Sequence, residues 1–273
     1  MRHLFPALVL ASLATVASPA RAQHAGHGDS APGADAPIPP TAGEPPHITY
    51  GWAPPVEDRM RFNYVLIDRL EFSSGDNPDA LTLDAEGWYG GDKHKFWWKA
   101  EGEERLEGAG EGDIGVQALY SRMIAPFWNV QAGARYDRTW GPGADLDRAF
   151  LVLGLEGVAP YWFELEPSLY VSEEGDVSAE ITGTYDVLLT QRLILQPRLD
   201  LGLAAQDVPE FGVGAGLNNV EFGLRLRYEI RREFAPYIGV SWVRQLGETA
   251  DLVRAAGEDV SDLRFVAGIR AWW

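Results

Sequence analysis

The chain has 273 residues, no cysteine and a formal net charge of −17 at pH 7. The lack of cysteine excludes a disulfide framework and any thiolate metal site or nucleophile, and the acidic charge argues against nucleic acid as a partner. Ten Trp, ten Tyr and eleven Phe beside 30 Gly are typical of a membrane barrel with aromatic girdles, although a large β-sandwich can have the same composition.

Residues 1–22 have the order of a secretory signal peptide. Arg2 and His3 precede an apolar run over residues 4–16, and the small-x-small sequence at residues 20–22 is a cleavage site. No stretch approaches the 18 consecutive apolar residues of a transmembrane helix. The exported product is therefore expected to be either soluble or a membrane protein built of strands.

The next part of the chain, residues 23–60, is rich in Ala, Gly, Pro and small polar residues. Because it has no periodic apolar pattern, we expect a disordered N-terminal tail. From residue 61 to 273 the pattern changes to segments of about ten residues that alternate apolar with polar side chains. These segments predict twelve strands, over residues 61–72, 80–89, 94–105, 113–123, 127–139, 146–157, 161–172, 177–188, 191–204, 218–230, 234–246 and 261–273.

The alternation places charges on one face of most segments, as expected for strands with one wet side. The connections distinguish a membrane barrel from a soluble sandwich. Along the chain, short connections alternate with longer ones. The connection at residues 172–176 is an exception, because it is short where a longer one is expected. This asymmetry is typical of barrels in the outer membrane of Gram-negative bacteria, which have even strand numbers and both termini in the periplasm. The sequence therefore predicts an all-β, transmembrane, antiparallel up-and-down barrel with its tail in the periplasm.

The final residue, Trp273, adds to this interpretation. An aromatic ring at the end of the last strand is expected at the membrane interface, in contact with outer-membrane lipid. It is also similar to the C-terminal aromatic signal that the barrel assembly machinery reads.

An enzyme inside the barrel is not expected. Outer-membrane phospholipases use a His and a Ser two residues apart, but His94 is the only histidine after His47, and Phe96 stands two positions beyond it. A single histidine also disfavours an outer-membrane aspartyl protease.

The polar faces of the strands supply charges to the lumen. A barrel of twelve strands has a narrow interior, so charges of both signs are expected to form ion pairs there, with a passive pore as the alternative. The predicted lumen residues are Glu86, Lys95, Lys99, Glu101, Glu103, Arg135, Asp137, Glu164, Glu166, Glu180, Asp186, Arg198, Asp200, Arg225, Arg227 and Glu229.

A few side chains could bind a soft or borderline metal ion. His24 and His27 are three residues apart in a Gly-containing tract, and imidazole suits copper, zinc and nickel. His47 and Met60 follow before the barrel, and His94 and Met123 are expected near the same rim. The thioethers of Met60 and Met123 would favour Cu(I). For each lone His or Met, packing or solvent exposure is the alternative.

Several longer stretches resemble the copper resistance protein B family of outer-membrane proteins, over residues 60–273. They are residues 68–71 (DRLE), 84–92 (DAEGWYGGD), 97–103 (WWKAEGE), 117–122 (QALYSR), 149–150 (AF), 154–163 (GLEGVAPYWF), 223–230 (GLRLRYEI) and 234–237 (FAPY). The resemblance implies a role in copper handling, with copper bound by an N-terminal extension rich in Met and His. This chain keeps only His24, His27, His47 and Met60 there.

Together, these observations predict a barrel that binds or passes copper ions, Cu(I) or Cu(II), as part of copper resistance, with a periplasmic copper-resistance protein as a possible partner. The alternative is a general channel or structural barrel without specific copper binding.

Overall fold

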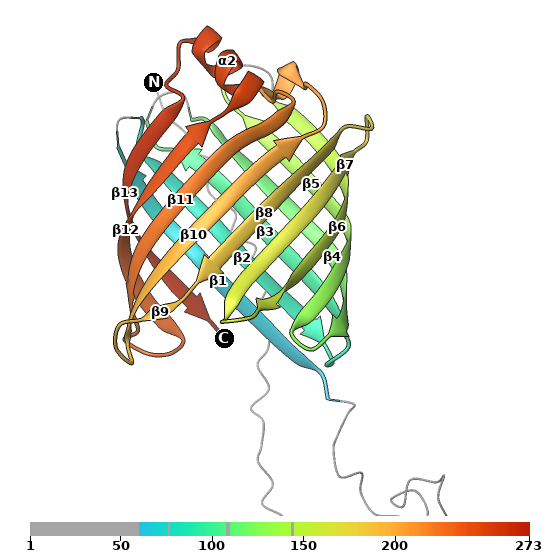
Figure 1. Cartoon of the computed structure of the whole chain (residues 1–273), viewed down its shortest axis with the longest axis vertical. Coiled ribbons are helices and arrows are strands. Elements are labelled where there is room, and N and C mark those ends of the chain that lie inside the picture. Colours follow the sequence, from blue (N-terminus) through green and yellow to red (C-terminus); the bar gives the residue numbers. More distant parts are fainter. Residues whose placement is uncertain (1–59, 76, 108–109, 143–144) are drawn as a thin grey trace, which may run out of the picture. The chain divides into compact units, whose positions relative to one another are not determined.

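The computed structural model describes residues 60–75, 77–107, 110–142 and 145–273. These residues form thirteen strands, one α-helix and one 3-10 helix, η1 (Figure 1). The elements are β1 (Phe62–Ser74), β2 (Ala80–Gly90), β3 (His94–Arg105), β4 (Gly112–Ala125), β5 (Trp128–Trp140), β6 (Leu146–Ala159), β7 (Phe163–Ser172), β8 (Val177–Tyr185), β9 (Val187–Leu188), β10 (Leu193–Ala204), η1 (Pro209–Phe211), β11 (Gly216–Tyr228), β12 (Phe234–Gln245), α2 (Gly247–Ala256) and β13 (Ser261–Trp272).

The strands form one closed antiparallel barrel. Each pairs with its neighbours along the chain, and β1 pairs with β13, which closes the wall. β8 and β9 pair in turn with β10, so they are two parts of one strand that is interrupted at Asp186. The wall therefore has twelve strands, which confirms the predicted fold class and strand count.

Side chains on the two faces of the wall differ in exposure and polarity. Along β4, Val116 and Tyr120 are exposed, whereas Gln117, Leu119 and Ser121 are buried. The exposed face elsewhere is also apolar, as at Leu151 on β6, which is 70% exposed. An apolar outer face with polar residues inside is the arrangement expected when lipid surrounds the barrel. No helix in the described part of the chain is long and apolar enough to cross a membrane.

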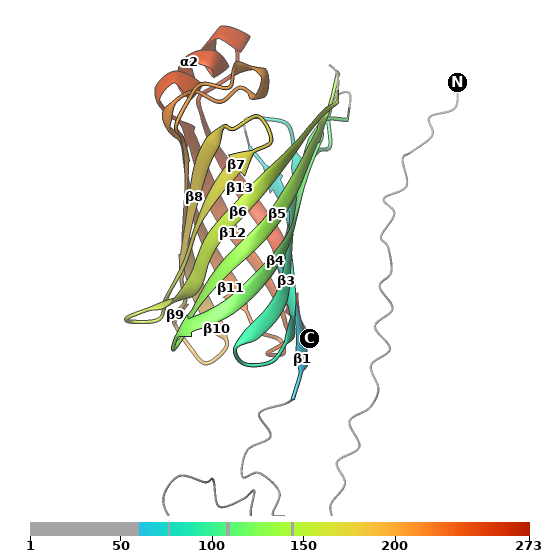
Figure 2. The same ribbon diagram turned by 90° about the vertical axis from the view of Figure 1, so that its right-hand side faces the viewer.

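The connections differ between the two ends of the barrel (Figure 2). The short-turn end carries the β2–β3, β4–β5, β6–β7, β9–β10 and β11–β12 turns, and the long-loop end carries most of the longer connections. The connections over residues 205–217 and 247–260 contain η1 and α2, which the sequence pattern does not predict.

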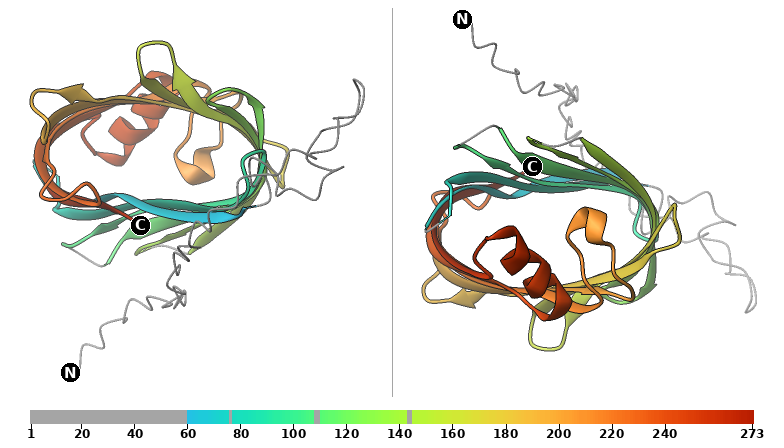
Figure 3. Two further views of the ribbon diagram at one scale, coloured as in Figure 1. Left: turned by 90° about the horizontal axis from the view of Figure 1, so that it is seen from below. Right: turned by 90° about the horizontal axis from the view of Figure 1, so that it is seen from above.

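Seen along its axis, the barrel is oval rather than round (Figure 3). α2 and the η1 loop lie within its outline at the long-loop end. Trp97, Leu119, Val152 and Tyr170 form a buried apolar cluster inside the wall. An oval section brings opposite parts of the wall closer together than a round one with the same number of strands.

Candidate functional site

The lumen contains a strongly acidic cavity of about 170 Å³. Nine carboxylate side chains and four basic ones line it, which leaves an excess of negative charge. The carboxylates are Asp68, Asp84, Glu86, Glu101, Glu164, Glu166, Glu180, Asp200 and Glu221, and the basic residues are Arg69, Lys99, Arg198 and Arg270.

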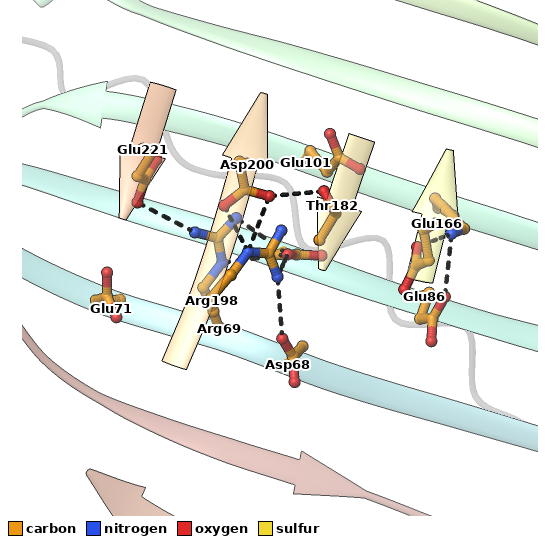
Figure 4. A network of polar contacts seen from close by, with 12 residues as sticks. Asp68, Arg69, Glu71, Glu86, Glu101, Glu166, Thr182, Arg198, Asp200 and Glu221 are labelled. Atoms are coloured by element: carbon orange, nitrogen blue, oxygen red, sulfur yellow. Dashed lines mark hydrogen bonds and ion pairs between the residues drawn. The ribbon is translucent and has the colours of Figure 1, made fainter. Parts of the chain in front are cut away.

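One ion-pair cluster is centred on Arg198 of β10 (Figure 4). Its Nη1 lies 3.5 Å from Asp68 of β1 and 3.4 Å from Asp84 of β2, and its Nε donates to Asp200 at 2.8 Å. β10 is not a neighbour of β1 or β2 in the sheet. These contacts therefore cross the lumen and connect opposite parts of the wall.

A β-bulge in β1 supplies two adjacent residues to this cluster. Ile67 pairs with Ala85 of β2 and Arg69 with Asp84, which leaves Asp68 as the extra residue. Both charged side chains consequently face the lumen: Asp68 accepts a hydrogen bond from Arg270 at 2.7 Å, and Arg69 lies 3.1 Å from Asp84. Strict alternation would have placed one of the two toward lipid.

A second cluster surrounds Lys99 of β3. Its ammonium lies 2.6 Å from Glu166, 3.2 Å from Glu156 and 3.7 Å from Glu86. Glu86 also accepts a hydrogen bond from Trp97 Nε1 at 3.1 Å. The cation is thus held by carboxylates from three strands, β2, β6 and β7, which balances part of their charge.

Other pairs extend the network toward β11 and β13. Arg225 donates to both oxygens of Glu71, at 2.7 and 2.9 Å, and both side chains are almost fully buried. Arg264 lies 3.2 Å from Glu103. The predicted ion-paired lumen is confirmed by these contacts. The predicted set did not include Asp68, Arg69 and Glu71, which lie in or after the bulge, or Glu156, Glu221, Arg264 and Arg270.

The long-loop end has a second pocket of about 330 Å³, the mouth pocket, which shares Tyr170, Glu180 and Asp200 with the acidic cavity. Arg148 packs over Phe150 of β6 and over Phe211 of η1, at 5.0 and 4.6 Å from the ring centroids, and pairs with Asp176. A hydrogen bond from Gln206, assisted by the Arg148 charge, lowers the pKa of Asp176. These contacts attach the η1 loop to the wall.

The η1 loop also contacts the start of α2. Thr249 Oγ1 accepts a hydrogen bond from the Gly214 N–H at 2.9 Å. A hydrogen bond between the carboxyl groups of Asp207 and Glu248 lowers the pKa of Asp207 and raises that of Glu248.

The rim residues predicted to bind metal are divided between the two faces of the wall. Met60 is 50% exposed just before β1. His94 is on the outer face of β3, where its Nδ1 lies 2.5 Å from the Tyr120 hydroxyl. Met123 is on the lumen face of β4, in line with Ser121. All three lie toward the short-turn end, as predicted, but the wall separates His94 from Met123.

No three His, Asp or Glu side chains of the described ranges are arranged to hold a metal ion. His24, His27 and His47 lie outside the described residues. The predicted ligand set therefore stays a prediction, and the acidic lumen is the feature with defined geometry.

Solved structures similar in fold to this chain include two porins. The KdgM porin aligns with 78% of this chain and 98% of its own, at a TM-score of 0.46 and 11% identity. The NanC porin aligns with 77% of this chain and 99% of its own, at a TM-score of 0.47 and 14% identity.

The sequence relatives are much more similar. Copper resistance protein B of Escherichia coli is 43% identical over 212 residues, which cover 77% of this chain and 70% of the relative. The copper resistance protein B homolog of Pseudomonas syringae pv. tomato is 40% identical over 218 residues, covering 80% and 72%. The family model described as "Copper resistance protein B precursor (CopB)" matches residues 61–273. This outer-membrane β-barrel therefore belongs to the copper resistance protein B family.

Proposed function

We propose that this barrel binds copper ions and passes them along its lumen as part of copper resistance. The observation that carries the proposal is the family match, which covers the whole barrel. The excess of carboxylates over basic side chains in the lumen cavity supports it, because such a cavity attracts cations. Ion pairs that cross the lumen would exchange partners as a cation moves through.

Capture is assigned to the residues before the barrel and at the short-turn rim. His24, His27, His47 and Met60 supply imidazole and thioether ligands to copper. At the rim, Met123 receives the ion on the lumen face, and His94 offers a separate ligand on the outer face. In this scheme the tail lies in the periplasm, where a copper-resistance partner protein delivers the metal. Trp273 contacts the barrel assembly machinery during insertion.

The test is copper stoichiometry on the refolded mature chain, with Cu(I) and Cu(II) measured separately. A variant with alanine at His24, His27, His47 and Met60 is expected to bind fewer copper ions per chain and to restore less copper tolerance to cells. The matched control has alanine at Ser30, Thr41 and Thr49, which are poor copper ligands. Equal stoichiometry and tolerance in the two variants would remove the tail from the capture step.

A second variant, His94→Ala/Met123→Ala, tests the rim. Its control is Lys93→Ala/Ile124→Ala, which changes the adjacent residues. If rim ligands receive copper, the first variant alone should show weakened binding. Unchanged binding in both would assign the copper to the tail alone.

The alternative function is a general channel or structural barrel, and the ion pairs that span the lumen from β10 to β1 and β2 favour the structural form of it, because they occupy the lumen. Planar-bilayer conductance separates the two functions. A stable pore with weak selectivity and no effect of copper would support the general channel. A small conductance that copper blocks or modifies would support specific copper handling.

A further inference from the structure

Four aromatic side chains form a continuous row on the lumen face near the short-turn end. Trp272 of β13, Tyr64 of β1, Trp88 of β2 and Trp97 of β3 occupy adjacent strands. Successive ring centroids are 6.1, 6.0 and 6.2 Å apart. We call this set the aromatic row. Its indole and phenol faces carry the negative side of the ring quadrupole, to which cations are attracted.

The aromatic row already holds a positive charge. The Lys95 ammonium lies 4.8 Å from the centroid of Trp88 and 5.9 Å from that of Trp97. Among the described residues no carboxylate lies within ion-pair distance of Lys95, in contrast to Lys99 two residues along the same strand. The ring faces are thus the binding partner of the Lys95 ammonium. They form a cation-binding site that a side chain of the protein itself occupies.

The aromatic row adjoins the acidic cavity. Glu86 is two residues from Trp88 on β2 and accepts a hydrogen bond from Trp97. A cation that moves between the carboxylates and the short-turn end therefore passes the ring faces and the Lys95 ammonium.

A thioether lies on the same part of the wall. Lys95 pairs with Ser121 of β4, and Met123 is the next lumen-facing residue after Ser121. In an antiparallel sheet such diagonal neighbours are within reach of long side chains. Thioether sulfur prefers Cu(I), and ring faces bind weakly hydrated monovalent cations in preference to strongly hydrated divalent ones.

We propose that the aromatic row is a binding site for the monovalent soft cation Cu(I), and that Lys95 is its resident competitor, which the metal ion displaces. The inference deepens the proposed function and rests on copper entering the lumen. It assigns Cu(I) rather than Cu(II) to this step. No bond to the protein is broken, and Lys95 keeps its proton as it moves away from Trp88.

The experiment uses the full mature chain in detergent, with Ag(I) as a redox-inert probe for Cu(I). Lys95→Gln removes the competing charge, so we expect Ag(I) to bind about tenfold more tightly. Cu(II) should gain much less, because it benefits only from the loss of the Lys95 repulsion and not from the uncovered ring faces. Lys95→Arg keeps a cation over the rings and is expected to resemble the wild type.

A second substitution tests the rings themselves. Trp88→Leu keeps an apolar side chain but removes one ring face, so Lys95→Gln/Trp88→Leu should lose the gain seen in Lys95→Gln. The matched control, Lys95→Gln/Trp98→Leu, removes an indole from the outer face of the same region of β3 and should keep the gain. Quenching of tryptophan fluorescence by Ag(I) should follow the same order.

The results separate this inference from the proposed function. Equal Ag(I) affinity in the wild type and Lys95→Gln overturns the inference, even if the tail variants show that the chain binds copper. A gain that survives Trp88→Leu overturns it as well. If the tail variants leave copper binding unchanged while Lys95→Gln still binds Ag(I) more tightly through Trp88, the tail proposal fails and the aromatic row stands.

Discussion

At the scale of single residues, the lumen is stabilised by charges that are buried together with their partners. Lys99 shows this most clearly, because its side chain is only 12% exposed and three carboxylates surround its ammonium. Removing one partner of a buried ion pair leaves the other charge uncompensated, which costs more than the pair itself contributes. The three glutamates then repel one another across the lumen.

Lys99→Met is therefore expected to lower the free energy of unfolding by about 3 kcal/mol, as measured by urea titration in detergent micelles. Adding Glu156→Gln should recover part of the loss, because it removes one of the unpaired carboxylates. Lys93→Met is the control: Lys93 is an exposed lysine in the β2–β3 turn. A Lys99→Met protein as stable as Lys93→Met would show that this cluster does not stabilise the fold.

Alternation alone predicts that the charged side chains of Glu86, Lys99 and Arg198 face the lumen. It does not predict this for both Asp68 and Arg69, because the bulge between them breaks the period of two. The sequence also does not predict which of the lumen charges form ion pairs with each other. The contact between Arg198 and Asp68 joins residues 130 positions apart, on strands that are not neighbours in the sheet.

At the scale of elements, two neighbouring short turns are strained. Phe127 in the β4–β5 turn and Tyr161 and Trp162 in the β6–β7 turn have φ of 67°, 70° and 66°. A bulky residue in this left-handed region costs about 1–2 kcal/mol. The β4–β5 turn is joined to the end of β6 by the hydrogen bond from the Val158 N–H to the Phe127 carbonyl, 3.0 Å long. Tyr161 and Trp162 are 87% and 76% exposed, so contacts within the chain do not compensate for this strain.

Replacing Tyr161 and Trp162 by Asn and Gly is expected to stabilise the barrel in micelles by about 2 kcal/mol, since turns with two positive φ values favour that pair. The urea midpoint measures the change. Tyr161→Leu/Trp162→Leu removes the rings but keeps both β-carbons, so it should give no such gain. An Asn-Gly variant less stable than the natural turn would mean that the rings contribute more than the strain costs.

The elements themselves were largely predictable. All twelve predicted segments correspond to strands, because charge on one face and apolar residues on the other set a strong period of two. The interruption at Asp186 was not predicted, since its side chain accepts bonds from Gln196 and Arg227, which are on other strands. α2 was missed because it begins at Gly247 without a side-chain cap, which removes the usual start signal.

At the scale of the whole molecule, the two ends of the barrel are chemically distinct. The long-loop end carries α2 and the mouth pocket, and the short-turn end carries Met60 and the aromatic row. If the short turns face the periplasm, as barrels of this kind are oriented, the capture residues lie on the periplasmic side. The absence of cysteine from the sequence makes this orientation directly testable.

Single cysteines at Ala255 in α2 and at Lys93 in the β2–β3 turn should differ in labelling by a membrane-impermeant maleimide on intact cells. Both positions are exposed. We expect Ala255→Cys to react from outside, and Lys93→Cys to react only after the outer membrane is permeabilised. The reverse pattern would invert the barrel and place the capture residues at the cell surface.

The bulge at Asp68 and Arg69 also affects how the chain can change length. Elsewhere in a strand, adding or deleting one residue turns every following side chain to the opposite face, so that apolar residues would enter the lumen and charges would meet lipid. Deleting Asp68 would instead leave a strand that alternates without interruption, with Leu66, Arg69 and Glu71 still inside. The register of β1 would therefore survive the loss of one residue at this point, and the cost of that deletion would come from the lost Asp68 carboxylate, which pairs with Arg198 and Arg270.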